Sequence, residues 1–554
     1  MRAPCLLVWL SSVAAAASHE SWSTTVSSEA GRLLEAAHAL RTVDQHNATA
    51  LYTQITAMGD AAATRKALYA LGDLAFPSAA AQSLFEQSAA LGHAGAQHTL
   101  ALLAAVDDAT PSLATSVLYD AFSAAGGDSR AAQTLGYRSL YGLGAPLSCA
   151  AALQYYKQQA AIVVREGAAM VAGQWRKPIS LVDDDDRNPT LDQYKLTYVA
   201  ASAISSKDGK VLFRAAKHLL QRGNIDFLLV RHWLVLALTF GETPAAAYLG
   251  HFYAFGWGGP INYAKALAAY LIAKDAKGGE ALLGIGLLYL HGHGVAQSTE
   301  LALEHFDKAA LQGHAEAMYY VARILTSKKQ LSLAARYYEA ASKSGHALGM
   351  HAYAGLIEKT SIHPFLRTCA LAVTLYKRVS EASVHPWLDR AHAAFHRGDH
   401  ATSFLLYRLV AEEGYTTALD NALWLVHEGY VVASDAVRHR LVERAAAQGS
   451  GLGKLLQADA WLKAGDHKRA LVAYASLVTT KTLSYKHIAP AYYSLGYMHE
   501  MGLGVLRSRA QALEYYRQSI AVERRVQLPI ELWTWKWALL DVLRSVLGES
   551  SWWV

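Results

Sequence analysis

Histidines are the residues of this chain whose type and spacing could bind a metal ion. His291 and His293 stand two residues apart, and a histidine follows a glycine at His93, His314 and His346. Imidazole is the commonest protein ligand for transition metals, but residues i and i+2 do not share a face of a helix. The other three lie in turns far apart in the sequence. We interpret all five as loop histidines and predict no metal site.

Acidic and nucleophilic residues also lack a pattern that supports catalysis. The run Asp183–Asp186 has neither the alternating ligand spacing nor the following glycine and glutamate of an EF-hand, so we interpret it as a solvated loop. The sequence contains no G-x-x-x-x-G-K, G-x-S-x-G or H-E-x-x-H motif. We therefore predict that the chain is not an enzyme, with no catalytic residues and no cofactor.

Composition excludes several other classes of protein. Of the 554 residues, 53% are hydrophobic and 17% are charged, which is too apolar for a disordered chain, and three cysteines are too few for a disulfide scaffold. The 51 Lys and Arg against 45 Asp and Glu leave a net charge of +6, and no basic block is interleaved with aromatic residues. We expect no nucleic-acid partner.

The first residues have the character of a secretory signal. Arg2 supplies a positive charge, a short apolar segment follows, and Ala15–Ala17 has the small residues of a cleavage site, so we predict a signal peptide over residues 1–17. Asn47 begins an Asn-Ala-Thr sequon, which is glycosylated only in the secretory pathway. Both features predict that the chain enters that pathway.

A regular spacing of small residues indicates the secondary-structure elements that would position a site. Between Ala281 and Phe306 the pattern is Ala-x4-Gly-x5-Gly-x-Gly-x7-Ala-x3-aromatic, and it starts again at Ala131, Ala245 and Ala491. Such periodicity predicts stacked supersecondary units. The paired glycines of the four copies are Gly142 and Gly144, Gly256 and Gly258, Gly292 and Gly294, and Gly502 and Gly504.

Each copy is expected to fold as two antiparallel helices. Apolar residues recur at helical spacing on both sides of the glycine pair, and small residues in the first helix let the second approach closely. The glycines end the first helix, because glycine adopts positive φ without a steric penalty. We predict an all-α fold, an α-solenoid of helix hairpins whose concave face binds other proteins.

Repeat character covers most of the chain, with a break around the acidic run and a weaker one near residue 361. Less regular hairpins resembling tetratricopeptide repeats fill the intervals between the clear copies. The predicted organisation is a signal peptide over 1–17, an N-terminal array over 30–163, an insertion or linker over 164–192, a middle array over 193–360, a C-terminal array over 361–525 and a Trp-rich helix over 529–554.

The cysteines are expected to be free. Cys5 would leave with the signal peptide, and Cys149 and Cys369 lie far apart in the sequence. Distant repeats of a linear stack do not normally touch, so a disulfide between them is not expected. We interpret both as small buried hydrophobic residues.

The repeat resembles a known family. Residues 281–313, ALLGIGLLYLHGHGVAQSTELALEHFDKAALQG, are similar to the Sel-1-like repeat, a longer relative of the tetratricopeptide repeat. The order of segments is more specific: SCAAALQYYKQQA, the SLVDDDD run, FLRTCALAVTLYKRV and YYSLGYMHEMGLGV follow one another as in the lumenal Sel-1-like adaptors of Hrd-type ubiquitin ligases. Those adaptors serve endoplasmic-reticulum-associated degradation.

The resemblance implies a function and partners. It implies a lumenal scaffold that binds misfolded glycoprotein clients or an endoplasmic-reticulum lectin and hands them to a membrane-embedded RING ubiquitin ligase. A secreted or periplasmic scaffold that activates an envelope enzyme is the alternative, because Sel-1-like arrays occur in many settings.

The C-terminal residues depart from that family, whose animal and fungal members end in a transmembrane helix. The segment 529–554 is too short and too charged to span a bilayer, but it places Trp533, Trp537, Leu540 and Leu543 along one helical stripe. The stripe is expected either to contact the membrane interface or the ligase, or to cap the last repeat. Both interpretations fit the sequence.

Overall fold

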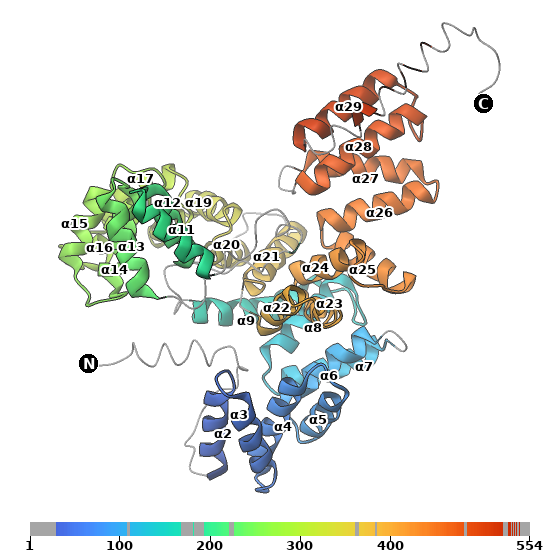
Figure 1. Cartoon of the computed structure of the whole chain (residues 1–554), viewed down its shortest axis with the longest axis horizontal. Coiled ribbons are helices and arrows are strands. Elements are labelled where there is room, and N and C mark those ends of the chain that lie inside the picture. Colours follow the sequence, from blue (N-terminus) through green and yellow to red (C-terminus); the bar gives the residue numbers. More distant parts are fainter. Residues whose placement is uncertain are drawn as a thin grey trace. The chain divides into compact units, whose positions relative to one another are not determined.

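The computed structural model describes residues 29–107, 111–167, 181, 193–220, 226–359, 365–382, 385–480, 485–523, 530–532, 535, 537, 539 and 542. The regular structure in these ranges is α-helical, without a strand, which confirms the predicted all-α fold (Figure 1). The predicted signal peptide, the acidic run Asp183–Asp186, and Trp533, Leu540 and Leu543 lie outside the described residues.

The described helices fall into two units. The first unit includes Glu412–Gly414 together with the helices up to α21. Its helices are α2 (Glu29–Leu40), α3 (Gln45–Thr56), α4 (Ala61–Ala75), α5 (Ala79–Ala90), α6 (Ala94–Val106), α7 (Leu113–Ala125), α8 (Ser129–Tyr141), α9 (Cys149–Gly167), α11 (Gln193–Ser205), α12 (Gly209–Leu220), α13 (Phe227–Thr239), α14 (Pro244–Phe255), α15 (Tyr263–Ile272), α16 (Glu280–His291), α17 (Thr299–Leu311), α18 (Ala315–Ser327), α19 (Leu331–Lys343), α20 (Ala347–Lys359) and α21 (Phe365–Ser380).

The second unit contains the remaining repeats and the described C-terminal residues. Consecutive helices pack against each other in both units, for example α16 with α17 and α28 with α29, as expected for stacked hairpins. The helices of the second unit are α22 (Pro386–His396), α23 (His400–Glu412), α24 (Thr416–His427), α25 (Asp435–Ala447), α26 (Gly451–Lys463), α27 (His467–Thr479), α28 (Tyr485–Met501) and α29 (Arg509–Val522).

The glycine pairs form the turns between the two helices of a repeat. The eight glycines have φ between +67° and +74°, the left-handed region that favours glycine. Gly292 ends α16, and its N–H donates to the carbonyl of Leu288. The second glycine of each pair also contacts the preceding repeat: a Cβ on Gly294 would lie 2.8 Å from the Cβ of Tyr263, at the start of α15. The pair therefore turns the chain and seats one hairpin on the next.

Small residues also allow the aromatic ring of the second helix to enter the first. Tyr270 of α15 is 1% exposed and lies between Gly250 of α14 and Gly284 of α16. A Cβ at either glycine would come within 2.3 Å of the Tyr270 ring. The equivalent rings of Tyr156, Phe306 and Tyr516 are buried to the same degree. The Ala-x3-aromatic pattern thus supplies the centre of each hairpin.

We predict that Gly284→Ala destabilises the first unit by about 1–2 kcal/mol. Alanine favours a helix by about 1 kcal/mol over glycine, but overpacking a buried ring costs about 1–3 kcal/mol or more. Gly355→Ala in α20 is the matched control, because its Cβ would meet only the Tyr376 hydroxyl, at 3.7 Å. That variant should be neutral or stabilised. Denaturant midpoints compare the two, and equal stability in both variants would contradict the packing argument.

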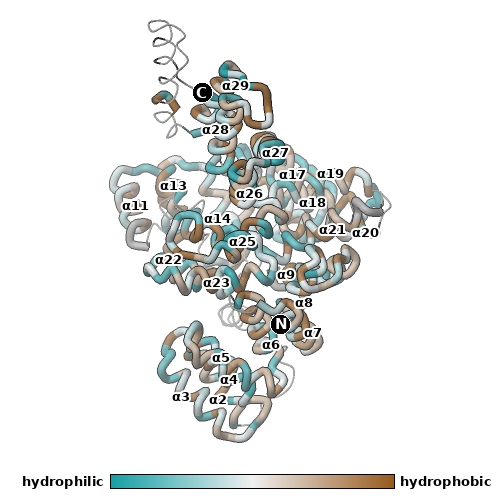
Figure 2. Tube along the Cα trace, turned by 90° about the vertical axis from the view of Figure 1, so that its right-hand side faces the viewer, coloured by the Kyte–Doolittle hydropathy of each residue, from teal (hydrophilic) through white to brown (hydrophobic). Residues whose placement is uncertain are grey.

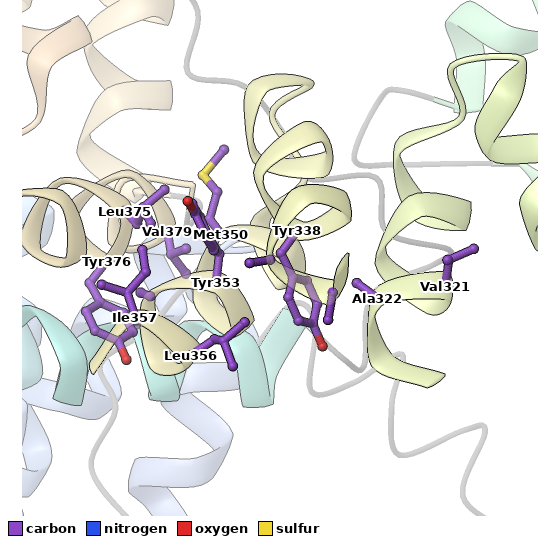
Figure 3. Packing of buried hydrophobic residues seen from close by; sticks show 14 of the residues in the cluster. Val321, Ala322, Tyr338, Met350, Tyr353, Leu356, Ile357, Leu375, Tyr376 and Val379 are labelled. Carbon is purple, nitrogen blue, oxygen red and sulfur yellow. The ribbon is translucent and has the colours of Figure 1, made fainter. Parts of the chain in front are cut away.

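One hydrophobic core joins α8 and α9 to α16–α21. It includes Tyr137 of α8, Tyr156 of α9, and Tyr376 and Val379 of α21, the helix that packs along α9. Figure 3 shows Met350, Tyr353 and Tyr376 within this cluster, and Figure 2 shows that hydrophobic residues recur in helix after helix rather than in one segment. Each hairpin therefore buries its apolar side against its neighbours.

The structure corrects the prediction for the cysteines. Cys149 at the start of α9 and Cys369 in α21 form a disulfide with their Cα atoms 6.3 Å apart. The prediction was wrong because it assumed a linear stack, whereas α21 returns to pack along α9. Lys157 of α9 and Glu358 of α20 form an ion pair beside this contact, with 2.5 Å between Nζ and Oε2. Residues 220 positions apart are therefore neighbours.

Candidate interaction surface and buried polar clusters

The histidines that follow glycines begin helices. His93 and His314 are the N-caps of α6 and α18, and their Nδ1 atoms accept the backbone N–H groups of Ala96 and Ala317. His346 similarly accepts the N–H of Gly349 in α20, at 3.1 Å. Imidazole nitrogen thus takes the place of the usual Ser or Asp oxygen. These residues have a structural role that the loop interpretation missed.

The remaining candidate metal ligands are not grouped. The His293 ring stacks on Tyr263 with 4.5 Å between ring centroids, and the rings of His291 and His293 are 5.5 Å apart. Within the described ranges, no group of three or more His, Cys, Asp or Glu is arranged to hold a metal ion. Burial lowers the pKa of His291, with the charges of His293 and Arg323 adding to the effect.

A buried charged cluster, the His98 cluster, joins α6, α7 and α8 to Glu413. His98 lies 2.9 Å from Asp120 through Nδ1 and 3.4 Å from Glu413 through Nε2. Arg138 pairs with Asp120 at 3.3 Å, and His385 pairs with Glu413 at 3.1 Å. These side chains are at most 3% exposed. Buried charges are tolerated here because each has an opposite partner.

The backbone beside Glu413 is held by the same surroundings. Gln133 of α8 donates to the Glu413 carbonyl at 3.2 Å, and the Lys377 Nζ of α21 donates to the Gly414 carbonyl at 3.0 Å. Gly414 has φ of +95°, and a Cβ there would lie 2.9 Å from the Tyr137 ring. The backbone at Glu413 and Gly414 is therefore held by side chains of α8 and α21.

Electrostatics assign charge states to this cluster. Burial opposes the charge on His98, but hydrogen bonds to Asp120 and Glu413 raise its pKa to about 9. Burial alone would raise the pKa of Glu413, yet the His385 and His98 partners hold it well below its usual value. At neutral pH the cluster therefore contains an imidazolium ion held between two carboxylates.

We predict that the first unit loses stability as the pH rises through about 9. Because the folded pKa of His98 is raised above its unfolded value of 6.5, its contribution is complete below pH 6.5 and disappears as the proton leaves near pH 9. Denaturant midpoints measured between pH 6.5 and 9.5 test this. His98→Gln should flatten the profile, whereas His46→Gln, at an exposed position of α3, should leave it unchanged. An identical slope in all three proteins would contradict the assignment.

A second polar cluster links three successive repeats. Glu280 at the start of α16 accepts from the Nε2 atoms of His251 and His314, at 2.8 and 3.1 Å. The Tyr270 hydroxyl lies 2.8 Å from Nδ1 of His251. Burial by itself would raise the pKa of Glu280, but the hydrogen bonds from His251 and His314 hold this pKa well below its usual value. The cluster fixes the register of neighbouring hairpins rather than forming an open site.

The sequence analysis predicted neither polar cluster, although the residues of α7 have a pattern that indicates one of them. Ser116, Asp120 and Ser123 lie on one face of this helix and are fully buried, while Leu118 and Phe122 are more than half exposed. A polar face at spacing i, i+4, i+7 in an otherwise apolar helix predicts a buried polar network. The partners of Asp120 were not predictable in this way, because they come from other helices.

The C-terminal residues pack one face against the last repeat. Trp537 is 8% exposed, and its Nε1–H donates to Oε1 of Glu500 at 2.7 Å. The Tyr516 hydroxyl donates to the other oxygen of Glu500, at 2.9 Å. The Arg509 guanidinium lies over the Trp537 ring. Of the four residues predicted to form a docking stripe, Trp537 is the one within the described residues, and it packs on this repeat. The docking role of the four residues stays a prediction.

The opposite face of this segment forms an exposed apolar stripe, the C-terminal stripe. Its members are spaced as one face of a helix, and the corresponding described positions are helical. They are Leu532, Trp535, Leu539 and Val542, which are 56, 69, 61 and 57% exposed. No helix in the described part of the chain is long and apolar enough to cross a membrane. The stripe is the candidate interaction surface.

Asn47 is placed near the start of α3. Its side chain is exposed, and its Nδ2 group donates to the carboxylate of the N-cap residue Asp44. Thr49, the third residue of the sequon, is also exposed. Attachment of a glycan at Asn47 stays a prediction.

Comparison with known proteins identifies the class of repeat. The Sel1 repeat matches residues 129–161, 243–275, 279–314, 315–346 and 489–521. These segments correspond to the hairpins α8–α9, α14–α15, α16–α17, α18–α19 and α28–α29. These five segments are therefore Sel1 repeats, as the glycine spacing indicated.

Named relatives come from plants and animals. The chain is 27% identical over 311 residues to the ERAD-associated E3 ubiquitin-protein ligase component HRD3B of Arabidopsis thaliana, covering 53% of this chain and 50% of that protein. It is 31% identical over 170 residues to Arabidopsis HRD3A, covering 26% and 24%. It is 27% identical over 189 residues to human protein sel-1 homolog 2, covering 33% and 27%. The matches span half or less of each relative's length.

These comparisons bear on the predicted class of function. A repeat family of scaffolds and relatives named as ligase components support a scaffold rather than an enzyme. The two Arabidopsis relatives are named as components of an ERAD-associated E3 ubiquitin-protein ligase, which confirms the resemblance at this coarse level.

Proposed function

We propose that this chain is a non-enzymatic adaptor of endoplasmic-reticulum-associated degradation. In this role it binds misfolded glycoprotein clients, or a lectin that carries them, and docks on a membrane-embedded RING ubiquitin ligase. The observation that carries the proposal is the match to HRD3-type ligase components over about half of the chain. Stacked hairpins support it physically, because they offer an extended surface for binding other proteins.

The disulfide supports a location in the lumen of the endoplasmic reticulum. Disulfides persist in oxidising compartments and are rare in the cytosol. The Cys149–Cys369 bond joins two helices of one core rather than two exposed loops. The exposed sequon at Asn47 is consistent with the same compartment.

The C-terminal stripe is the surface we assign to docking on the ligase. Four large apolar side chains spaced along one helix face, each more than half exposed, are unusual on a protein surface without a partner. The opposite face is anchored by Trp537 and Ile530, so the stripe is presented outward. A tryptophan at its centre also suits a partner at the membrane interface.

Affinity purification of the tagged full-length chain from its own cells tests the function. A multi-spanning RING ligase should copurify with the wild type, and Trp535→Ser combined with Leu539→Ser should weaken this association. Leu311→Ser is the matched control, since Leu311 is an apolar residue 88% exposed in the first unit.

Four outcomes would contradict parts of the proposal. Absence of any RING ligase would contradict the adaptor function, and export of the chain beyond the endoplasmic reticulum would favour the secreted scaffold. Full retention of the ligase by the stripe variant would contradict the docking surface alone. Binding of the chain to phospholipid vesicles, lost in the same variant, would assign the stripe to the membrane interface instead.

A further inference from the structure

Helix α7 of the first unit has an apolar side that faces solvent. Its large residues Leu118 and Phe122 are 55 and 57% exposed. A surface helix normally buries its apolar side and exposes polar residues. We call the exposed side the α7 face. It carries no charged residue, because its members are Ala114, Thr115, Leu118, Ala121, Phe122 and Ala125.

The core of this hairpin differs from the cores on either side of it. The second helix of the preceding hairpin, α5, places Phe85 at its centre, and the second helix of the following hairpin, α9, places Tyr156 there. In α7 the equivalent position holds Asp120, and all three side chains are fully buried. The aromatic ring of the repeat is therefore replaced by a carboxylate.

The outer positions are exchanged in the opposite sense. Leu118 and Phe122 stand two residues before and two residues after the core position of α7. The same two positions are polar and exposed in both neighbouring helices, where they hold Ser83 and Gln87 in α5, and Gln154 and Gln158 in α9. The apolar α7 face is therefore a departure of one helix from its own repeat pattern.

Polar contacts hold α7 in this orientation. The Ser116 hydroxyl donates to the carbonyl of Ala101 at 2.5 Å, and the Ser123 hydroxyl donates to the carbonyl of Ala94 at 2.7 Å. Asp120 forms the buried ion pairs of the His98 cluster. Rotation of the helix to bury its large apolar residues would leave the partners of Asp120 buried and unpaired, which is strongly unfavourable.

The size and charge of the α7 face indicate the kind of partner that fits it. Since a large side chain covers about 150–250 Å², Leu118 and Phe122 at just over half exposure offer roughly 200 Å² together. A second folded copy docked there would bury far less than the roughly 800 Å² per partner of a stable interface. A short apolar segment can be accommodated on such a face, and an acidic or basic segment would find no charge to pair with.

We propose that the α7 face binds apolar segments of unfolded client proteins. The occupant rests on the proposed function, because an adaptor of degradation meets chains whose apolar residues are not buried. Leu118 and Phe122 supply the main contacts, and the alanines beside them leave room for the side chains of the bound segment. Exposed apolar patches of this kind commonly mark interaction sites.

Binding of an unfolded probe to the purified full-length chain tests the site. The probe is fluorescent α-lactalbumin that has been reduced and blocked with iodoacetamide, so that it cannot refold. Fluorescence anisotropy should show binding of this probe and none of native α-lactalbumin. Leu118→Gln combined with Phe122→Gln should weaken binding by at least about tenfold, because the loss of one important contact residue has about this effect. The ratio between wild type and variant should not change with salt, since both side chains are uncharged.

Two controls separate this site from general hydrophobicity and from misfolding. Leu228→Gln combined with Val235→Gln removes two exposed apolar residues of α13, which are 69 and 40% exposed, and should bind the probe like the wild type. The α7 variant should keep the wild-type denaturant midpoint, because α9 has glutamine at the same two positions. A photoreactive amino acid at Ala121 should crosslink to the probe, whereas the same amino acid at the exposed position Gln87 of α5 should not.

Several results would overturn the proposal. Equal probe affinity in the wild type and the α7 variant, or an equal loss in the α13 variant, would show that α7 is not the site. A wild-type dimer in light scattering that dissociates in the α7 variant would assign the face to a second copy of the chain. These measurements use the purified chain alone, so they are independent of the copurification of a ligase, and their failure would leave the adaptor function itself intact.

Discussion

Replacing Cys369 with serine should lower the stability of the first unit by about 5 kcal/mol. The disulfide to Cys149 closes a loop of 220 residues, and in the chain-entropy model loops longer than 100 residues restrict the unfolded chain by about 5 kcal/mol. The bond also joins α9 to α21, helices that share one hydrophobic core. Its loss should therefore loosen the contact between repeats that are far apart in the sequence.

The effect is best measured as a shift of the denaturant midpoint. A free energy of unfolding requires unfolding in one step, and a repeat array does not always unfold in this way. Reducing agent should destabilise the wild type to the level of the variant and leave the variant unchanged. Cys149→Ser should behave like Cys369→Ser, and the double variant should lose no more than either single one. Mass spectrometry should recover the linked peptides from the wild type. A midpoint insensitive to reduction would contradict the structural role of the bond.

Trp537→Ala should unfold the end of the second unit, with a loss of about 3–5 kcal/mol as for other large-to-small changes in a core. The indole fills the space beside Tyr516 and donates a hydrogen bond to Glu500. Removing it opens a cavity at the terminal hairpin, α28–α29. In a linear array such damage spreads only to the nearest repeats.

Hydrogen exchange of the full-length chain can localise this loss. Amides of α28 and α29 should exchange faster in Trp537→Ala, while α2–α9 keep their protection. Trp535→Ala is the matched control, because Trp535 is 69% exposed and exposed substitutions usually change stability by less than about 0.5 kcal/mol. Equal exchange in the two variants would contradict the opposite placement of the two tryptophans.

The two tryptophans also separate stability from function. If the chain has the proposed function, Trp535 contributes to docking, and the packing of Trp537 on the last repeat holds the docking surface in place. A change at Trp535 should therefore alter partner binding in a protein of normal stability, whereas a change at Trp537 should reduce both. This pair gives the docking proposal a control within a single segment of the chain.

The repeat and its hairpins were predictable from residues that lie close together in the sequence. One hairpin contains all of the residues that define the pattern, namely Gly286, the pair Gly292 and Gly294, and Phe306. Because these residues contact one another locally, their spacing predicts the local structure directly. The turn glycines could be assigned for the same reason, since positive φ is a property of one residue and its neighbours.

The contacts between distant repeats could not be predicted from the sequence. The pairing of Cys149 with Cys369 and of His98 with Glu413 depends on which helices pack together across long sequence separations, as α21 does along α9. No local pattern of residues contains that information. Which side of the last segment faces outward also depends on tertiary contacts. Trp537 is buried because it packs beside Tyr516 and donates a hydrogen bond to Glu500, and both residues belong to other helices.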